Sequence, residues 1–270
     1  MTNCFFDNVS YAYQDPTAPT LRHFTYDFSS SKTAILGANG SGKSTLLHLI
    51  DTLFEANEGT ITIHHQQVHQ RSAKAIRKHI GFVFDHPENQ LFAPTVFEDI
   101  AFGPKNQGMS KQAVTKTVYE AASFMRITDL LDHSPYHLSL GQKKKTAMAG
   151  VIAMKPDMLL FDEPFSGLDP ASLQTMIDTL NQLEQRGHQI ILTTHDVDIA
   201  YQWADDFLLL KEGTLLAHGG TEVLENESMV QEANLKLPML YRLFQHTAER
   251  PKTVEEARSY MFSEEGGPCV

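Results

Sequence analysis

The nine residues GANGSGKST, at positions 37–45, constrain the fold of this chain more than any other stretch. The apolar run TAIL precedes them, and the residues that follow, LLHLI, favour a helix. Glycines such as Gly37, Gly40 and Gly42 let successive backbone N–H groups turn toward one anion, and the N-terminus of the helix adds partial positive charge. This spacing between a strand and a helix predicts a phosphate-binding loop, and a chance glycine-rich turn is the alternative.

The polar residues of the loop match the needs of a bound nucleotide. In a loop of this kind the lysine, here Lys43, reaches the terminal phosphates, and the hydroxyl of Ser44 holds Mg²⁺. We expect three further loop residues to surround the phosphates: Asn39, Ser41 and Thr45.

The rest of the chain predicts an α/β fold with a mainly parallel core sheet, because short runs of Ile, Leu and Val alternate with longer helical patterns. Buried strands are expected at 33–36, 158–161 and 190–192, and an antiparallel layer at 5–13 and 61–63.

Three segments are predicted around this core. We expect a nucleotide-hydrolysing domain over residues 1–224, with a helical subdomain inserted at about 86–155 and most clearly helical over 109–133. Residues 225–270 are expected to form a C-terminal helical extension. Val254, Ala257 and Met261 would share a face of its last helix, and a mobile tail would begin at 264.

Composition excludes several functional classes. The formal net charge of −11 argues against a dedicated nucleic-acid surface, which would concentrate Lys and Arg. Two cysteines, Cys4 and Cys269, favour a reducing cytosolic setting over a disulfide framework, and no secretory signal is expected at the N-terminus. No apolar run approaches the ~20 residues of a membrane-spanning helix, so a membrane role requires a partner.

Two further strand ends carry polar residues. The run MLLFDE places Asp162 and Glu163 at the end of a strand, where the sheet borders its ligand. Asp162 can bind the water shell of Mg²⁺ and Glu163 can polarise an attacking water, although two acids here could also cap a helix. His195 ends the strand ILTT in the same manner.

The ordered motifs resemble those of the nucleotide-binding subunit of ABC transporters. More narrowly, PENQLFAPTVFEDIAFGP, KKKTAMAGVIAMKP, THDVDIAYQWADD and NLKLPMLYRLF resemble the ATPase of energy-coupling-factor importers, especially their cobalt and nickel branch, although vitamin-importing relatives share much of this wording. The general motifs are Tyr13, GANGSGKST, residues 84–92, LSLGQ at 138–142, LLFDEP, SGLD at 166–169 and TTHD.

The resemblance implies a sandwich of two ATPase subunits around two ATP molecules, in which the LSLGQ segment of one subunit closes the phosphate loop of the other. Tyr13 would stack on adenine, and Glu163 and His195 would be catalytic. Ser139, Gly141 and Gln142 would face the γ-phosphate of the partner's ATP, with Asp169 at the dimer interface. An unsatisfied helix N-terminus after a serine favours such an anion site.

The resemblance also implies partners and a location. A transmembrane coupling subunit, a substrate-binding membrane subunit and a second ATPase subunit are expected, with no nucleic acid, at the cytoplasmic face of the membrane. The pair can be a homodimer or a heterodimer. The implied cargo is a transition metal ion, cobalt or nickel. The alternatives are a vitamin importer, a soluble ABC ATPase acting on nucleic acid or ribosomes, and a nucleotide switch without turnover.

Some positions depart from the family pattern or leave two interpretations open. Asp85 stands where the family has glutamine in a loop that senses Mg²⁺, so it must either touch the metal or point away. Leu140 replaces a common glycine. Lysines 143–145 would face something negative or form a solvated turn. Phe92, Val96 and Phe97 suit either a docking groove or the subdomain core. His64, His65 and His69 are more typical of solvated turn residues than of a metal site.

Overall fold

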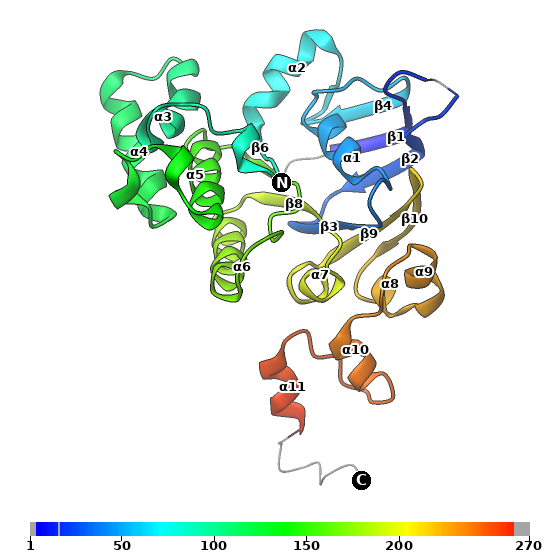
Figure 1. Cartoon of the computed structure of the whole chain (residues 1–270). Helices are drawn as coiled ribbons and strands as arrows, with labels where there is room; N and C mark the ends of the chain where they lie inside the picture. The colour runs from blue at the N-terminus through cyan, green and yellow to red at the C-terminus, as the bar shows by residue number, and fades with distance from the viewer. Residues whose placement is uncertain (1–3, 16, 262–270) are drawn as a thin grey trace.

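The chain forms two β-sheets, with the lateral helices on one side of them (Figure 1). The computed structural model describes residues 4–15 and 17–261. The six-stranded sheet has the order β10-β9-β3-β8-β7-β6 and is parallel except at the β9–β10 pair. Its strands are β3 (Lys32–Leu36), β6 (Ile80–Val83), β7 (Met158–Phe161), β8 (Gln189–Thr194), β9 (Asp206–Lys211) and β10 (Thr214–Gly219). The expected parallel core sheet is therefore confirmed.

The second sheet is antiparallel and has the order β2-β1-β4-β5. It consists of β1 (Cys4–Tyr11), β2 (Leu21–Phe28), β4 (Glu58–Ile63) and β5 (Gln66–Gln67). The first strand ends at Tyr11, two residues earlier than the sequence predicted, so Tyr13 lies in the turn that follows. Because the strand ends before Tyr13, this residue is not part of the sheet.

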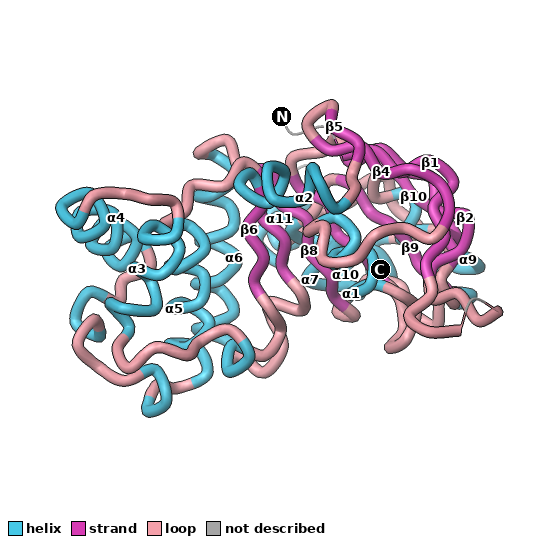
Figure 2. Tube along the Cα trace, turned by 90° about the horizontal axis from the view of Figure 1, so that it is seen from above, coloured by secondary structure: helices cyan, strands magenta, loops and turns pink. Residues whose placement is uncertain are grey.

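Helices cover the parallel sheet and extend to one side of it (Figure 2). The helices beside the core are α1 (Lys43–Ile50), α2 (Gln70–Ile76), α6 (Pro170–Gln185) and α7 (Val197–Trp203). Those of the lateral region are α3 (Val96–Asn106), α4 (Lys111–Phe124) and α5 (Leu140–Ile152). The C-terminal helices are α8 (Glu222–Glu225), α9 (Glu227–Glu232), α10 (Met239–Phe244) and α11 (Val254–Met261).

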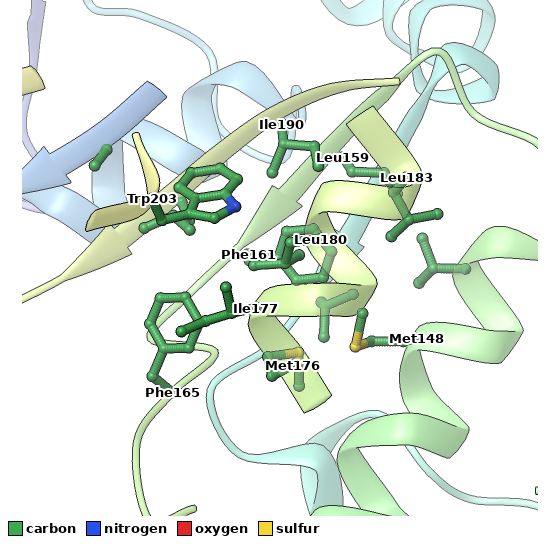
Figure 3. Close-up of a cluster of buried hydrophobic side chains, with 14 of the residues drawn as sticks. Met148, Leu159, Phe161, Phe165, Met176, Ile177, Leu180, Leu183, Ile190 and Trp203 are labelled. Carbon is green, nitrogen blue, oxygen red and sulfur yellow. The ribbon is translucent and has the colours of Figure 1, made fainter. Parts of the chain in front are cut away.

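Successive residues of the central strands pack into two different cores. In β7, Leu159 and Phe161 join the core beneath α6 and α7, whereas Met158 and Leu160 face α1 and the antiparallel sheet. Figure 3 shows the first of these cores, where Phe161 packs beside Leu180 of α6. Complete burial of such side chains contributes roughly 1.5–3 kcal/mol each. Burial on both faces explains why these strands are continuously apolar.

The chain leaves the sheet after β6, builds the lateral helices and returns at β7. Val96 is fully buried there and Phe97 packs partly buried against the same core, whereas Phe92 is exposed. Each of the two interpretations of this apolar stretch therefore applies to part of it. Val96 belongs to the subdomain core, whereas Phe92 is at the surface, where a docking groove would need it. The pattern expected over 109–133 is interrupted, because α4 ends at Phe124 and only short 3-10 turns follow.

Helices α10 and α11 lie away from the two sheets (Figure 1). Of the predicted apolar face of α11, only Ala257 is buried, and Val254 and Met261 are exposed. The tail expected from residue 264 onward lies outside the described residues. Within the described part of the chain, no helix combines the length and apolar character needed to span a bilayer.

Candidate functional site

The glycine-rich loop joins β3 to α1, and two of its glycines are sterically required. Gly37 has φ 155°, and a Cβ there would lie 2.4 Å from the carbonyl oxygen of Leu210. Gly42 is the N-cap of α1 with φ 104°, a conformation that side chains disfavour. Because glycine occupies both positions, the backbone can enter α1 directly from the tight turn.

Several hydrogen-bond donors converge on this turn. The N-cap of α1 makes no side-chain cap hydrogen bond, so the first N–H groups of the helix remain available to an anion. The buried hydroxyl of Ser41 has no hydrogen-bond partner within the described structure. Lys43 Nζ donates to the carbonyl oxygens of Gly37 and Ala38, at 2.9 and 3.2 Å. This donor set fits phosphate groups.

A cavity of about 400 Å³ contains most of the residues that the sequence assigns to the nucleotide, but Gly37 and Ser41 are not part of its lining. It lies where β3, β6 and β7 end, as expected for the carboxyl edge of a parallel sheet. Its lining consists of Tyr13, Thr20, Asn39, Gly40, Gly42, Lys43, Ser44, Thr45, Asp85, Asp162 and Glu163. The structure thus brings the loop and the acidic pair together.

The acidic pair is held by a threonine that the sequence analysis did not single out. Thr193 Oγ1, at the end of β8, donates to Asp162 Oδ1 at 2.6 Å and accepts from the backbone N–H of Glu163 at 3.0 Å. The capping alternative is wrong, because the next helix, α6, is capped by Asp169. The only sequence signal for Thr193 was its place in the motif TTHD.

Glu163 lies between a lysine and a histidine. Its Oε1 is 3.9 Å from Lys43 Nζ, and its Oε2 is 3.0 Å from His195 Nδ1. Burial lowers the pKa of Lys43, and the charges of Glu163 and Asp162 oppose that shift. Glu163 also has φ 45°, an uncommon conformation for a residue with a side chain. Its carboxylate is therefore fixed in position but remains within the cavity.

His195 is exposed and borders a neighbouring cavity of about 430 Å³ rather than the phosphate cavity itself. Asn39 lines both cavities, so the two adjoin at the loop. His195 therefore contacts Glu163 directly. It is linked to the phosphate loop only indirectly, because Asn39 of that loop lines both cavities.

Lys144 is almost completely buried, contrary to the solvated-turn alternative. Its Nζ donates to the carbonyl oxygens of Glu163, Pro164 and Ser166 at 2.9–3.2 Å. It also lies 4.0 Å from Asp85 Oδ1. This lysine holds the N-terminal part of α5 against the segment that follows β7, a contact that no local sequence pattern indicates.

Asp85 is part of the lining of the phosphate cavity, and its carboxylate lies 4.0 Å from Lys144 Nζ and 3.5 Å from His86 Nε2. Ser44 and Asp162 offer further oxygen ligands to the same cavity. Oxygen donors of this kind fit Mg²⁺, a hard cation that retains several water ligands. The side-chain amide of Gln90 binds the backbone instead: its Nε2 donates to the carbonyl oxygen of Phe82, and its Oε1 accepts from the N–H of Phe84.

The predicted signature residues lie outside this cavity. Ser139 caps α5 in a capping box with Gln142, and both Ser139 and Leu140 are exposed. A Cβ on Gly141 would lie 3.3 Å from Ser172 Oγ, which donates to Asp169 Oδ2 at 2.6 Å. These residues therefore form one exposed surface on α5 and α6. Within one chain they do not complete the phosphate site.

Tyr13 has the exposure that a stacking ring requires. Its side chain is 55% exposed, whereas that of Tyr11 is buried. The hydroxyl of Tyr13 lies 2.9 Å from Thr45 Oγ1, which holds the ring beside the phosphate loop. The geometry therefore agrees with the choice of Tyr13 over Tyr11.

Comparison with known proteins places this geometry in a family. The profile of the ABC transporter family matches residues 23–166. The energy-coupling factor transporter ATP-binding protein EcfA of Carboxydothermus hydrogenoformans is 41% identical over 234 residues, which cover 86% of this chain and 87% of that protein. EcfA2 of Methanospirillum hungatei is 40% identical over 247 residues, but this chain spans only 62% of that longer relative.

Two solved structures agree with the sequence relatives. CbiO1 from Clostridium perfringens, part of the ABC transporter complex cbiONQ, has a TM-score of 0.76 and 32% identity, covering 90% of this chain and 98% of that one. The ATP-binding cassette MJ0796, in a dimeric post-hydrolysis state bound to ADP and Pi, has a TM-score of 0.73 and 25% identity, covering 80% and 98%. The chain is thus an ATPase of the energy-coupling-factor type, and it belongs to the ABC transporter family.

Proposed function

We propose that this ATPase powers the uptake of a transition metal ion, cobalt or nickel, through a separate transmembrane complex at the cytoplasmic face of the membrane. The likeness to CbiO1, itself part of a transporter complex, supports a role in transport. A vitamin importer is the alternative for the cargo, because the ATPase relatives are named for energy coupling and not for a substrate.

The proposed hydrolytic arrangement follows from the cavity. Lys43 and the first amides of α1 would bind the phosphates, and Ser44 and Asp162 would hold Mg²⁺, which would supply charge neutralisation at the phosphate oxygens. Glu163 orients and polarises the attacking water, and His195 fixes its carboxylate and contacts the γ-phosphate. General-base assistance of this kind contributes typically ~10² to 10⁴ in rate.

One observation supports a two-subunit mechanism most strongly: the phosphate cavity and the signature surface are on separate parts of one chain. The cavity contains Lys43 and Glu163, whereas Ser139 and Gly141 are on the α5–α6 surface. We propose that the Ser139 surface of a second ATPase subunit closes the cavity, with Gln142 beside it and Asp169 at the interface. The uncapped N-terminus of α1 and the Ser139-capped N-terminus of the partner's α5 would then face one triphosphate from two sides.

The dimer is tested with Glu163→Gln, which keeps the shape of the side chain and removes its charge. With Mg-ATP we expect the variant to elute as a stable dimer in size-exclusion chromatography with light scattering, because hydrolysis no longer separates the subunits. The control is Glu163→Gln combined with Ser139→Arg, which should remain monomeric because the added side chain blocks the interface. A single variant that stays monomeric at saturating Mg-ATP would contradict the proposal.

A groove on the lateral region suits the proposed transmembrane coupling subunit. This groove of about 390 Å³ is lined by apolar Leu91 and Phe92, with Phe102 beside Phe92 at a centroid distance of 4.8 Å. Lys74 and Lys78 add positive charge at its border. An apolar groove with a charged border fits an amphipathic helix. A substrate-binding membrane subunit would complete the importer.

The cargo is tested in the assembled importer. Copurified membrane complex in vesicles should accumulate cobalt or nickel in an ATP-dependent manner, and the Glu163→Gln complex should not. Accumulation of a vitamin instead of either metal would refute the metal assignment and leave the ATPase assignment intact.

We also propose a division of the chain. Residues 1–224 act as the ATPase domain with the helical subdomain at about 86–155, because α3, α4 and α5 lie between β6 and β7 and pack on one another. The chain from residue 225 onward is the proposed C-terminal extension, whose described part contains α9, α10 and α11.

A further inference from the structure

Two histidines and an aspartate come together at the amino ends of β6 and β7, which are the ends opposite the nucleotide cavity. His79 Nδ1 lies 2.6 Å from Asp157 Oδ2, and His64 Nε2 lies 3.6 Å from the same oxygen. The two imidazole rings are 4.5 Å apart between centroids. One ligand atom from each residue lies within 4.8 Å of the others.

The fold fixes all three positions. His79 directly precedes β6 and Asp157 directly precedes β7, and the parallel pairing of Ile80 with Met158 sets these two residues side by side. His64 lies in the turn between β4 and β5, in the antiparallel sheet. The cluster therefore bridges the two sheets.

His64 Nε2 is the least satisfied atom of the cluster. It is buried and has no hydrogen-bond partner within the described residues, although its side chain is partly exposed as a whole. A buried imidazole nitrogen without a partner is costly, and it is aimed at the carboxylate of Asp157. His79 and Asp157 are exposed, so an ion has a path to the site from solvent.

We propose that His64, His79 and Asp157 bind a late first-row divalent cation such as Zn²⁺, Ni²⁺ or Co²⁺. Two imidazoles and one carboxylate favour these metals over Mg²⁺ and Ca²⁺, which take oxygen ligands. Tetrahedral bonds of about 2.0–2.1 Å separate ligand atoms by about 3.3 Å, so small side-chain rotations would suffice. Water would occupy the remaining coordination position.

The assignment differs from the grouping visible in the sequence. His69, which lies near the other two in the chain, instead caps α2 by accepting a hydrogen bond from Ser72 at its Nδ1. His79 and Asp157 are distant from His64 in sequence and meet it only in the fold.

The metal would join the β4–β5 turn to the amino ends of β6 and β7. The opposite ends of these two strands carry Asp85 and Asp162, at the phosphate cavity. We therefore expect binding to stabilise the contact between the sheets and to be independent of nucleotide. The site does not depend on the proposed cargo.

The test uses the tag-free, nucleotide-free full chain with excess Mg²⁺, which occupies the oxygen ligands of the phosphate cavity. Calorimetric titration with Zn²⁺, and visible absorption with Co²⁺, should show one site per chain. The melting temperature should rise with Zn²⁺.

Matched variants locate the ion. His64→Asn and His65→Asn alter neighbouring residues of one turn that both have positive φ, which asparagine tolerates. Of this pair, only His64→Asn should weaken Zn²⁺ binding, by about tenfold or more. Asp157→Asn removes another proposed ligand and should weaken binding to a similar extent. Melting temperatures measured without metal confirm that the variants fold. Absence of saturable binding by the unaltered chain, or equal losses in His64→Asn and His65→Asn, would overturn the proposal.

Discussion

Individual residues around Glu163 show how this site is held in shape. Its left-handed backbone is fixed from one side by Thr193 and from the other by Lys144, which binds its carbonyl oxygen. A residue in this conformation persists only when its surroundings determine it. The precise direction of the Glu163 carboxylate therefore depends on residues that need not touch ATP.

Thr193→Val tests this dependence, because it preserves the shape of the side chain and removes the hydroxyl. Asp162 loses a donor and the Glu163 amide loses its acceptor, so we expect turnover at saturating Mg-ATP to fall roughly ten- to hundredfold. Thr193→Ser retains the hydroxyl and should keep most of the activity. Equal activity of the Val and Ser variants would show that the contact is dispensable.

Asp51 gives a prediction about stability rather than activity. Burial raises its pKa to about 7, and Arg77 only partly offsets that shift. The folded chain therefore binds this proton more tightly than the unfolded chain, whose pKa is the ordinary value of 3.8. Its contribution to stability must fall as pH rises from about 4 to 7.

Asp51→Asn removes this pH-dependent cost. We expect its melting temperature to exceed that of the unaltered chain, with a larger difference at pH 8 than at pH 5. About 2–4 °C is expected for each kcal/mol gained in a domain of this size. Thermal unfolding followed by circular dichroism at both pH values measures the effect. A difference that is larger at pH 5 would reverse the assigned sign.

At the scale of elements, the N-terminus of α5 carries a serine, Ser139, with two roles that can be tested separately. Ser139 caps the helix by accepting from the Gln142 amide, and it is also the residue proposed to face the partner's phosphate. Loss of an N-cap alone costs about 0.5–2 kcal/mol. Stability and activity therefore report on different functions of this serine.

Ser139→Asp separates them, because aspartate is an equally good cap but places a negative charge against phosphate. We expect a melting temperature close to that of the unaltered chain and a loss of ATPase activity of at least about tenfold. Ser139→Ala should instead lower the melting temperature. If Ser139→Asp hydrolysed ATP normally, the proposed contact with phosphate would be wrong.

The sequence predicts some of these elements and contacts and not others. Strand β7 was predicted at its observed bounds, because a strand buried on both faces is a continuous apolar run. The phosphate loop was predictable because its spacing is local. The contacts of Lys144 and the approach of His64 to Asp157 were not, since both depend on tertiary packing between distant segments. The sequence leaves two orientations open for Asp85, and its place beside Lys144 and His86 at the cavity is visible only in the fold.

For the whole molecule, the proposed closure of the cavity by a second subunit would make hydrolysis a property of pairs. Turnover per chain should then rise with protein concentration and reach a plateau once dimers predominate, because each site would need a second subunit. Steady-state ATPase measured over nanomolar to micromolar chain, with light scattering in parallel, tests this expectation. Constant turnover by strictly monomeric protein would exclude the paired mechanism.

The buried ammonium of Lys144 has a consequence for how this enzyme fails on heating. It holds the N-terminal part of α5 against the backbone of residues 163–166, beside the carboxylate proposed to polarise the attacking water. Loss of these three contacts would release that carboxylate before the two sheets unfold. Inactivation is then expected to precede melting, and to reverse on cooling.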